Sequence, residues 1–130
     1  MILKLVFAMG LLSIAPFNSA SKTIPPSPEI VKFYTNIPEK NNWVTVPEGT
    51  KEITITVEAL NTETVLFWLI PTGTETWNER ILIGYDIKDD GDNFFSLTWK
   101  VSGPLLNHLE VQAIGETGMA GASLNITSNP

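Results

Sequence analysis

The sequence contains no cysteine and a single histidine in 130 residues. The missing cysteine excludes disulfide bonds, thiolate zinc sites and thiol catalysis, and one histidine excludes a metal site with several histidine ligands. Basic residues are also few, because 8 Lys and Arg stand against 14 Asp and Glu, for a net charge of −6. A nucleic-acid surface needs clustered cations, so we expect no nucleic-acid partner.

Long apolar runs are scarce too, and the most marked one lies at the N-terminus. It extends from Leu5 to Ala15, follows Lys4, and is much shorter than the ~20 residues of a membrane-spanning helix. We predict a secretory signal peptide over residues 1–20, cleaved after Ala20 or after Ala15. A buried first strand or an uncleaved anchor is the alternative. We therefore expect a secreted, extracellular mature chain without a lipid anchor, because no cysteine follows the run, and without a membrane span.

Helical periodicity is missing from the rest of the chain, which consists of short apolar or alternating segments. Residues 21–29 hold three prolines and predict an extended N-terminal spacer. Residues 51–59 alternate apolar and polar side chains, which is typical of a half-buried strand. We expect strands over residues 30–35, 43–46, 51–59, 64–70, 80–86, 94–101, 109–113 and 122–127.

Glycine and proline, nine of each, concentrate at the breaks between these segments. About seven short strands in about 100 residues match the size of an immunoglobulin-type sandwich. We therefore predict one all-β domain over residues 30–130, an immunoglobulin-like antiparallel β-sandwich of about seven strands.

Several segments resemble bacterial Ig-like domains, the accessory modules of secreted glycoside hydrolases, adhesins and other cell-surface proteins. They are TVLFWL at 64–69, RILIGYD at 80–86, FFSLTW at 94–99 and LEVQA at 109–113 before a glycine-rich turn. The resemblance covers residues 52–127, although the 71–79 connection is longer than the family's tight turn. The turn after Ala113, IGETG, also departs from the family's acidic residue followed by Gly-Asn. The resemblance implies a spacer or binding module and no shared catalytic residues.

The strand at 64–70 offers two faces to the core. A buried Trp68 would suit an antibody-like domain, where a tryptophan packs on a disulfide, but this chain has no cysteine. The resemblance instead implies that Val65, Phe67 and Leu69 point inward. An apolar patch, which usually marks an interaction surface, would then face outward unless the N-terminal segment or the 71–79 connection covers it. Its members are Leu66, Trp68 and Ile70.

Four tryptophans are more than a core of this size needs. Trp99 fits the core, whereas Trp77 lies in a polar connection. With Trp68, Glu75 and Asn78 it would form a stacking platform for sugar rings. The alternative is that Trp77 folds back and anchors the connection over the outward patch.

An acidic cluster suggests calcium, which prefers oxygen ligands. An EF-hand register that starts at Asp86 is broken by Lys88 at its third position and Leu97 at its twelfth. A looser calcium site and a solvated hairpin loop both remain open. The cluster comprises Asp86, Asp89, Asp90, Asp92 and Asn93.

Catalytic motifs are absent. No serine or cysteine nucleophile accompanies His108, which we expect to be a surface or hydrogen-bonded residue, and no acid pair faces a cleft as glycoside hydrolysis requires. We predict that the chain is not an enzyme and has no catalytic residue, cofactor or metal.

These observations predict a secreted, non-catalytic Ig-like module for protein or cell-surface interaction. A carbohydrate-binding module that uses exposed tryptophans is the alternative, so the partner is an extracellular protein or polysaccharide. The predicted binding surface consists of Leu66, Trp68, Ile70, Glu75, Trp77 and Asn78.

Overall fold

The computed structural model describes residues 24–73, 76–89 and 91–128, which form eight strands and one 3-10 helix. The predicted strands are confirmed, and the count is eight rather than about seven. The last two strands are longer than predicted because a tight turn, Glu116–Thr117, joins them directly. The elements are β2 (Glu29–Thr35), β3 (Trp43–Val46), β4 (Glu52–Leu60), β5 (Thr64–Pro71), η1 (Trp77–Glu79), β6 (Ile81–Ile87), β7 (Phe94–Lys100), β8 (Leu106–Gly115) and β9 (Gly118–Ser128).

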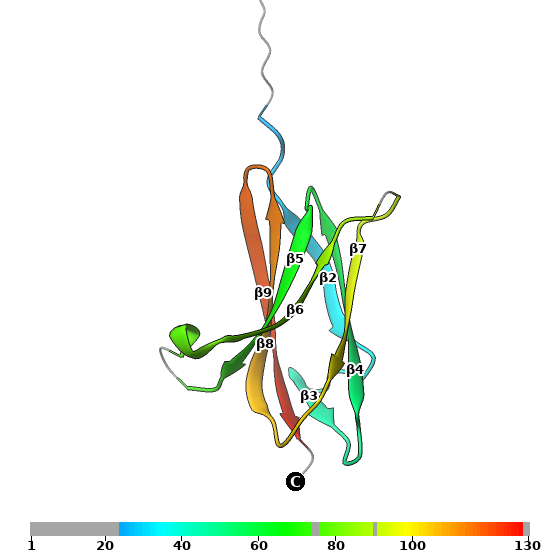
Figure 1. Ribbon diagram of the computed structural model, residues 1–130, viewed down its shortest axis with the longest axis vertical. Coiled ribbons are helices and arrows are strands. Elements are labelled where there is room, and N and C mark those ends of the chain that lie inside the picture. Colours follow the sequence, from blue (N-terminus) through cyan, green and yellow to red (C-terminus); the bar gives the residue numbers. More distant parts are fainter. Residues whose placement is uncertain (1–23, 74–75, 90, 129–130) are drawn as a thin grey trace, which may run out of the picture.

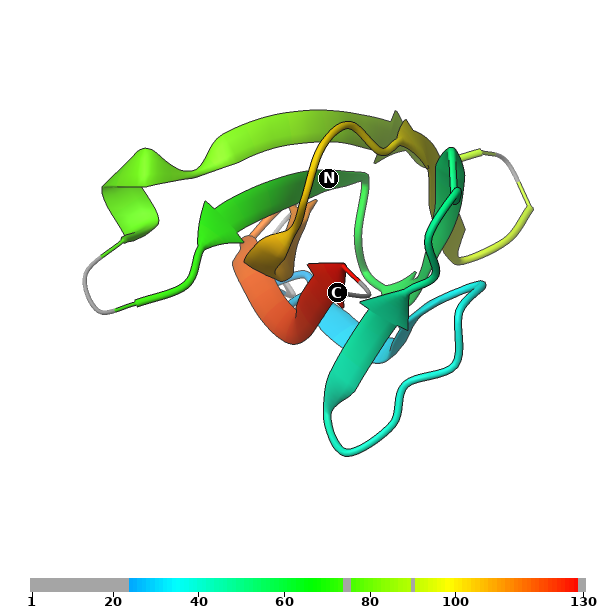
Figure 2. The ribbon, with the colours of Figure 1, turned by 90° about the horizontal axis from the view of Figure 1, so that it is seen from below.

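The strands form two sheets that pack face to face, so the predicted immunoglobulin-like sandwich is confirmed (Figure 1). One sheet has three strands in the order β2-β4-β7, and the other has five in the order β3-β9-β8-β5-β6. Figure 2 shows the two layers from one end. The sandwich is not wholly antiparallel as predicted, because β3 pairs parallel with β9. This follows from the loop after β2, which carries the chain from the first sheet to the far edge of the second.

The core lies between the sheets and is built by alternation. In β4 every second residue is buried, namely Ile53, Ile55, Val57 and Ala59, because successive strand residues point to opposite faces. Apolar side chains from β3, β5, β8 and β9 of the five-stranded sheet pack against this face. Trp99 of β7 belongs to the same core cluster, as predicted. The two largest fully buried side chains are Phe67 of β5 and Phe95 of β7.

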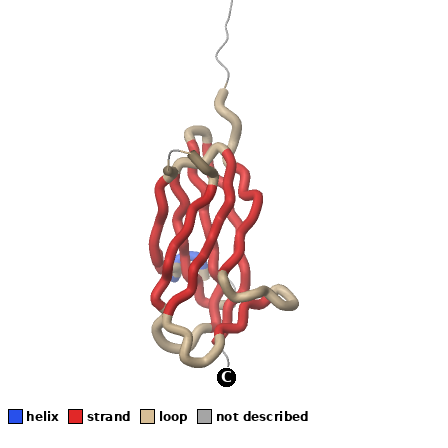
Figure 3. The backbone as a smooth tube through the Cα atoms, turned by 90° about the vertical axis from the view of Figure 1, so that its right-hand side faces the viewer, coloured by secondary structure: helices blue, strands red, loops and turns tan. Residues whose placement is uncertain are grey.

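The last residues of the predicted spacer belong to the domain. Pro28 is buried, and the Asn61 side-chain amide donates a hydrogen bond of 3.1 Å to the Ser27 carbonyl. The Thr117 hydroxyl lies 3.4 Å from the Pro26 carbonyl oxygen. The segment is therefore fixed at one end of the sandwich, and the described chain ends at the opposite end (Figure 3). The predicted signal peptide lies outside the described residues, among which no helix is long and apolar enough to cross a membrane.

Candidate functional site

The connection between β5 and β6 projects from the side of the sandwich (Figure 1). Local hydrogen bonds hold its described part: the Thr76 hydroxyl donates to the Pro71 carbonyl at 2.7 Å, and the Glu79 N–H donates to the Thr76 carbonyl at 2.9 Å. The Arg80 N–H then closes η1 on the Trp77 carbonyl at 3.2 Å. These bonds turn the chain back, so that η1 packs against β5.

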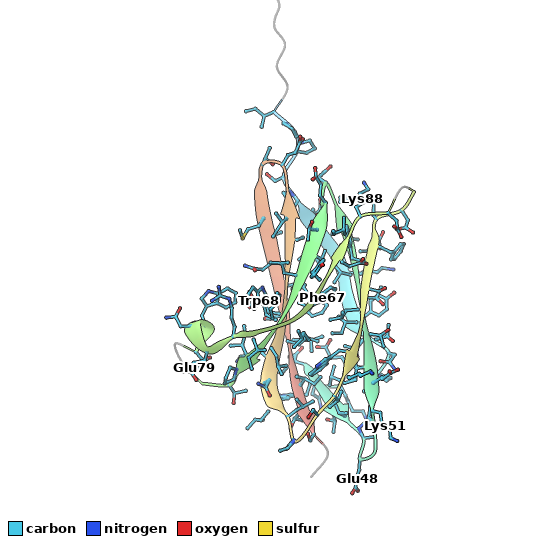
Figure 4. The ribbon with its side chains drawn as sticks, in the orientation of Figure 1. Glu48, Lys51, Phe67, Trp68, Glu79 and Lys88 are labelled. Carbon is cyan, nitrogen blue, oxygen red and sulfur yellow. The ribbon has the colours of Figure 1, made fainter. Side chains whose placement is uncertain are left out.

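Arg80 lies between two indole rings. Its guanidinium carbon is 4.5 Å from the ring centroid of Trp68 and 4.2 Å from that of Trp77, within the range of cation–π attraction. One guanidinium nitrogen donates to the Trp77 carbonyl at 3.1 Å, and no described group accepts from the buried Nε. Arg80 therefore ties η1 to the outer face of β5, and Figure 4 shows Trp68 on that side of the sandwich.

The two indoles do not form a flat platform. Their planes are tilted by 54° with centroids 6.2 Å apart, and Arg80 contacts a face of each ring. The Trp68 N–H donates a 2.7 Å hydrogen bond to the Gln112 side-chain oxygen, which fixes that ring on the sheet. This geometry favours the alternative in which Trp77 anchors the connection, and a sugar site built on coplanar indoles finds no support in it.

The predicted outward patch is largely covered. Leu66 and Trp68 are half-buried, and Ile70 is only 5% exposed although it does not belong to the core cluster. Burial of Ile70 favours the alternative in which another segment covers the outward patch. Of the other predicted site residues, Trp77 and Asn78 are exposed on η1, and Glu75 lies outside the described residues.

Exposed large apolar side chains are most numerous on the neighbouring strand β6. Four of its seven side chains are large, apolar and exposed, at 61%, 46%, 60% and 61% for Ile81, Leu82, Tyr85 and Ile87. We call these four residues the β6 patch. The β6 patch was not predicted from the sequence, because an apolar strand of a sandwich is expected in the core unless its position at a sheet edge is known. The segment ILIGYDI lacks the apolar–polar alternation of a half-buried strand, and this was the sequence feature that could have indicated an unusual exposure pattern.

Polar side chains occupy the outer face of the same sheet beside Trp68. Glu110 pairs with Trp68 across the strands, and burial raises the pKa of its carboxyl while His108 and Arg80 lower it less strongly. The half-buried His108 lies with its Nδ1 2.9 Å from the Asn125 side-chain oxygen, and the Asn125 amide donates to the Asn42 carbonyl at 3.1 Å. His108 is thus a hydrogen-bonded residue, as predicted.

Removing the Arg80 side chain should destabilise the packing of the β5–β6 connection on the sheet. We expect Arg80→Ala to lower the free energy of unfolding by ~1–2 kcal/mol, because two cation–π contacts are lost. A double-mutant cycle with Trp77→Ala, followed by urea unfolding, should give a coupling energy of about 0.5–1 kcal/mol. Lys88→Ala is the matched control, since Lys88 is an exposed cation at the other end of β6. Additive effects of Arg80→Ala and Trp77→Ala would contradict the stacking.

Glu110 should make stability depend on pH. Because its folded-state pKa is raised, the folded state binds the proton more tightly than the unfolded state. The resulting stabilisation is present at pH values below the unfolded pKa and is lost as the pH rises through the folded pKa. We therefore expect the difference in melting temperature, Glu110→Gln minus wild type, to become more positive as the pH rises from acidic to neutral. A constant difference would contradict this.

The acidic cluster predicted between β6 and β7 is partly engaged in local hydrogen bonds. The Asp86 carboxylate accepts from the Ser96 N–H at 2.8 Å, and the Asp92 carboxylate accepts from the Phe94 N–H at 3.0 Å. Asp90 lies outside the described residues. In the described part of the chain, no three His, Cys, Asp or Glu side chains lie close enough to hold a metal ion. Calcium binding by this loop stays a prediction.

No family model matches the chain, and no curated protein matches it significantly in sequence. Among solved structures, the superoxide reductase (neelaredoxin) from Ignicoccus hospitalis is similar with a TM-score of 0.52 and 13% identity, over 80% of this chain and 81% of that one. Another structure of that reductase gives 0.51 and 12%, over 81% and 82%. The major subunit of aggregative adherence fimbriae type I from Escherichia coli gives 0.36 and 12%, over 84% and 100%, a score too low to support an argument.

At these identities the similarity shows the fold alone, and membership of the bacterial Ig-like family stays a prediction. The similarity does correct one prediction. We expected that the chain is not an enzyme, but the solved structures that share its fold include superoxide reductases, which are enzymes. The fold is therefore compatible with catalysis, and missing sequence motifs did not justify the prediction.

Proposed function

We propose that the protein is a secreted Ig-like module that binds a protein or cell-surface partner through β6 and the adjacent η1. The observation that carries the proposal is the β6 patch. Contiguous exposed apolar surface is uncommon on soluble monomers and usually marks an interaction site. Trp77 on η1, whose ring lies beside that of Trp68, is also exposed, at 38%. Secretion rests on the predicted signal peptide at residues 1–20.

The chemistry of the patch favours a protein partner over a polysaccharide. Its side chains are three aliphatic groups and one tyrosine, and interfaces are enriched in tyrosine and apolar side chains at their centres. Glycan recognition would need flat aromatic faces with polar groups around them, whereas both indoles near the patch contact Arg80.

The test is affinity capture from the native extracellular fraction, followed by binding measurements with the purified partner. Leu82→Lys and Ile87→Lys each place a charge on the patch, and we expect each to weaken binding about tenfold or more. Leu106→Lys and Met119→Lys are matched controls, because both residues are comparably exposed on the same sheet away from β6. A partner that binds all four variants equally well would overturn the proposed surface.

A further inference from the structure

The two sheets have four edges, and three of them carry features that hinder pairing with another strand. β2 has an irregular register at Ile30–Lys32 and follows a proline-rich segment. β3 is only four residues long. On β7, the Asp86 side chain occupies the N–H of Ser96. Short strands, irregular registers, prolines and charged side chains are the means by which natural sheets avoid edge-to-edge association.

The edge of β6 lacks most of this protection. The strand is seven residues long, contains no proline or lysine, and pairs only with β5 among the described residues. Its one irregularity lies beside Ile83, opposite Phe67 and Trp68. Its one charged side chain, Asp86, is half-buried and turned toward β7. An extended, apolar and unpaired strand of this kind is a template for another strand.

The direction of the free backbone groups follows from the ladder between β5 and β6. The Lys88 N–H donates to the Glu63 carbonyl at 2.8 Å, one residue beyond the Thr64–Ile87 pair. Because residues in an antiparallel ladder alternate in the side to which their N–H and C=O groups point, Tyr85 and Ile87 direct theirs away from β5. The regular half of β6 therefore directs backbone donors and acceptors away from β5, where no described strand pairs with them.

We propose that the partner of this edge is β6 of a second copy of the chain, paired antiparallel about a two-fold axis near Tyr85, so that two five-stranded sheets become one. This inference rests on the proposed function and identifies the partner. A two-fold interface requires a patch that complements itself. Pairing about Tyr85 places each Asp86 beside Gly84 of the other copy, so the two carboxylates do not oppose each other.

The same pairing brings apolar side chains together. Each Ile87 reaches the Leu82–Ile83 pair of the other copy, and the two Tyr85 residues lie opposite each other. The interface uses one seven-residue strand from each copy, so it is smaller than the ~1,600 Å² that stable interfaces typically bury. The dimer is therefore weak and depends on concentration.

Sedimentation of the purified chain from micromolar to millimolar concentration tests the proposal. We expect the mass to rise from monomer to dimer and no further, because a two-fold interface closes on itself. Ile87→Lys should weaken the dimer about tenfold or more, since each dimer carries the substitution twice, whereas Met119→Lys should not. A monomer at every concentration, or growth into polymers, would overturn the proposal.

The absence of native cysteine permits a second measurement that does not depend on how well the lysine variants fold. Directly opposed residues in an antiparallel pair have Cα atoms about 4.5–5.5 Å apart, which a disulfide can span. Tyr85→Cys should therefore form a covalent dimer under mild oxidation at least about tenfold faster than Met119→Cys at the same concentration. Equal rates would overturn the pairing. If the chain stays monomeric but loses a captured partner in Ile87→Lys, self-pairing is wrong and the proposed function stands.

Discussion

Replacing Phe67 with alanine is expected to lower the free energy of unfolding by about 3–5 kcal/mol. Phe67 is 0% exposed, is one of the two largest fully buried side chains, and lies in the middle of the sandwich (Figure 4). The loss combines the transfer of the ring to water with the cavity that remains, because strands paired on both sides of β5 limit collapse. Since domains of this size are stable by only about 5–15 kcal/mol, the variant should be marginal.

Urea unfolding followed by tryptophan fluorescence measures this effect. Leu106→Ala is the control, because Leu106 belongs to the same sheet and is 58% exposed. It should change stability by no more than about 0.5 kcal/mol, as surface substitutions usually do. Similar losses in the two variants would show that Phe67 does not occupy the centre of the core.

Replacing Gly115 with alanine is expected to cost about 2–3 kcal/mol, because overpacking at a rigid site is destabilising. A Cβ at this position would overlap the Asn61 backbone carbonyl oxygen and approach the Pro28 ring to 2.9 Å. Asn61 itself has a positive φ of 56° and donates to the Ser27 carbonyl, so it cannot move without disturbing the docked N-terminal segment. Thermal unfolding monitored by circular dichroism measures the loss.

Gly121→Ala is a matched control in the next strand. A Cβ there would lie 3.6 Å from the nearest atom, the Val111 carbonyl oxygen, which is an ordinary contact. We expect its melting temperature to stay close to that of the wild type. If Gly115→Ala were equally well tolerated, Gly115 would not lie as close to Asn61 and Pro28 as described.

Alternation made most of the fold predictable. Residues 51–59 carry a strict period of two, and the strand found there buries the predicted face. The inward Val65 and Phe67 were also predicted correctly. Period-two patterns report which side of a strand is buried, but they carry no information about which strand lies next to it. The parallel pairing of β3 with β9 therefore had no signal in the sequence.

The candidate site was harder to predict, because it depends on what covers a sheet and where the sheet ends. Ile70 alternates outward yet is buried, since exposure on that face depends on what packs against it. Trp68 and Trp77 were expected as a platform, but the position of Arg80 beside them is a tertiary contact. Ile81 and Ile87 look like core residues and lie at an edge. Each of these features depends on tertiary contacts, which a local sequence pattern does not encode.

The parallel pairing of β3 with β9 has a mechanical consequence. The docked N-terminal segment and the C-terminal end of the described chain lie at opposite ends of the long axis (Figure 3), so a pulling force applied at both ends acts along the strands. Trp43–Val46 runs in the same direction as Asn125–Ser128, and tension would draw the two segments past each other lengthwise. The contacts between them are then loaded together rather than opened one after another. A module held in this way resists extension between its two ends.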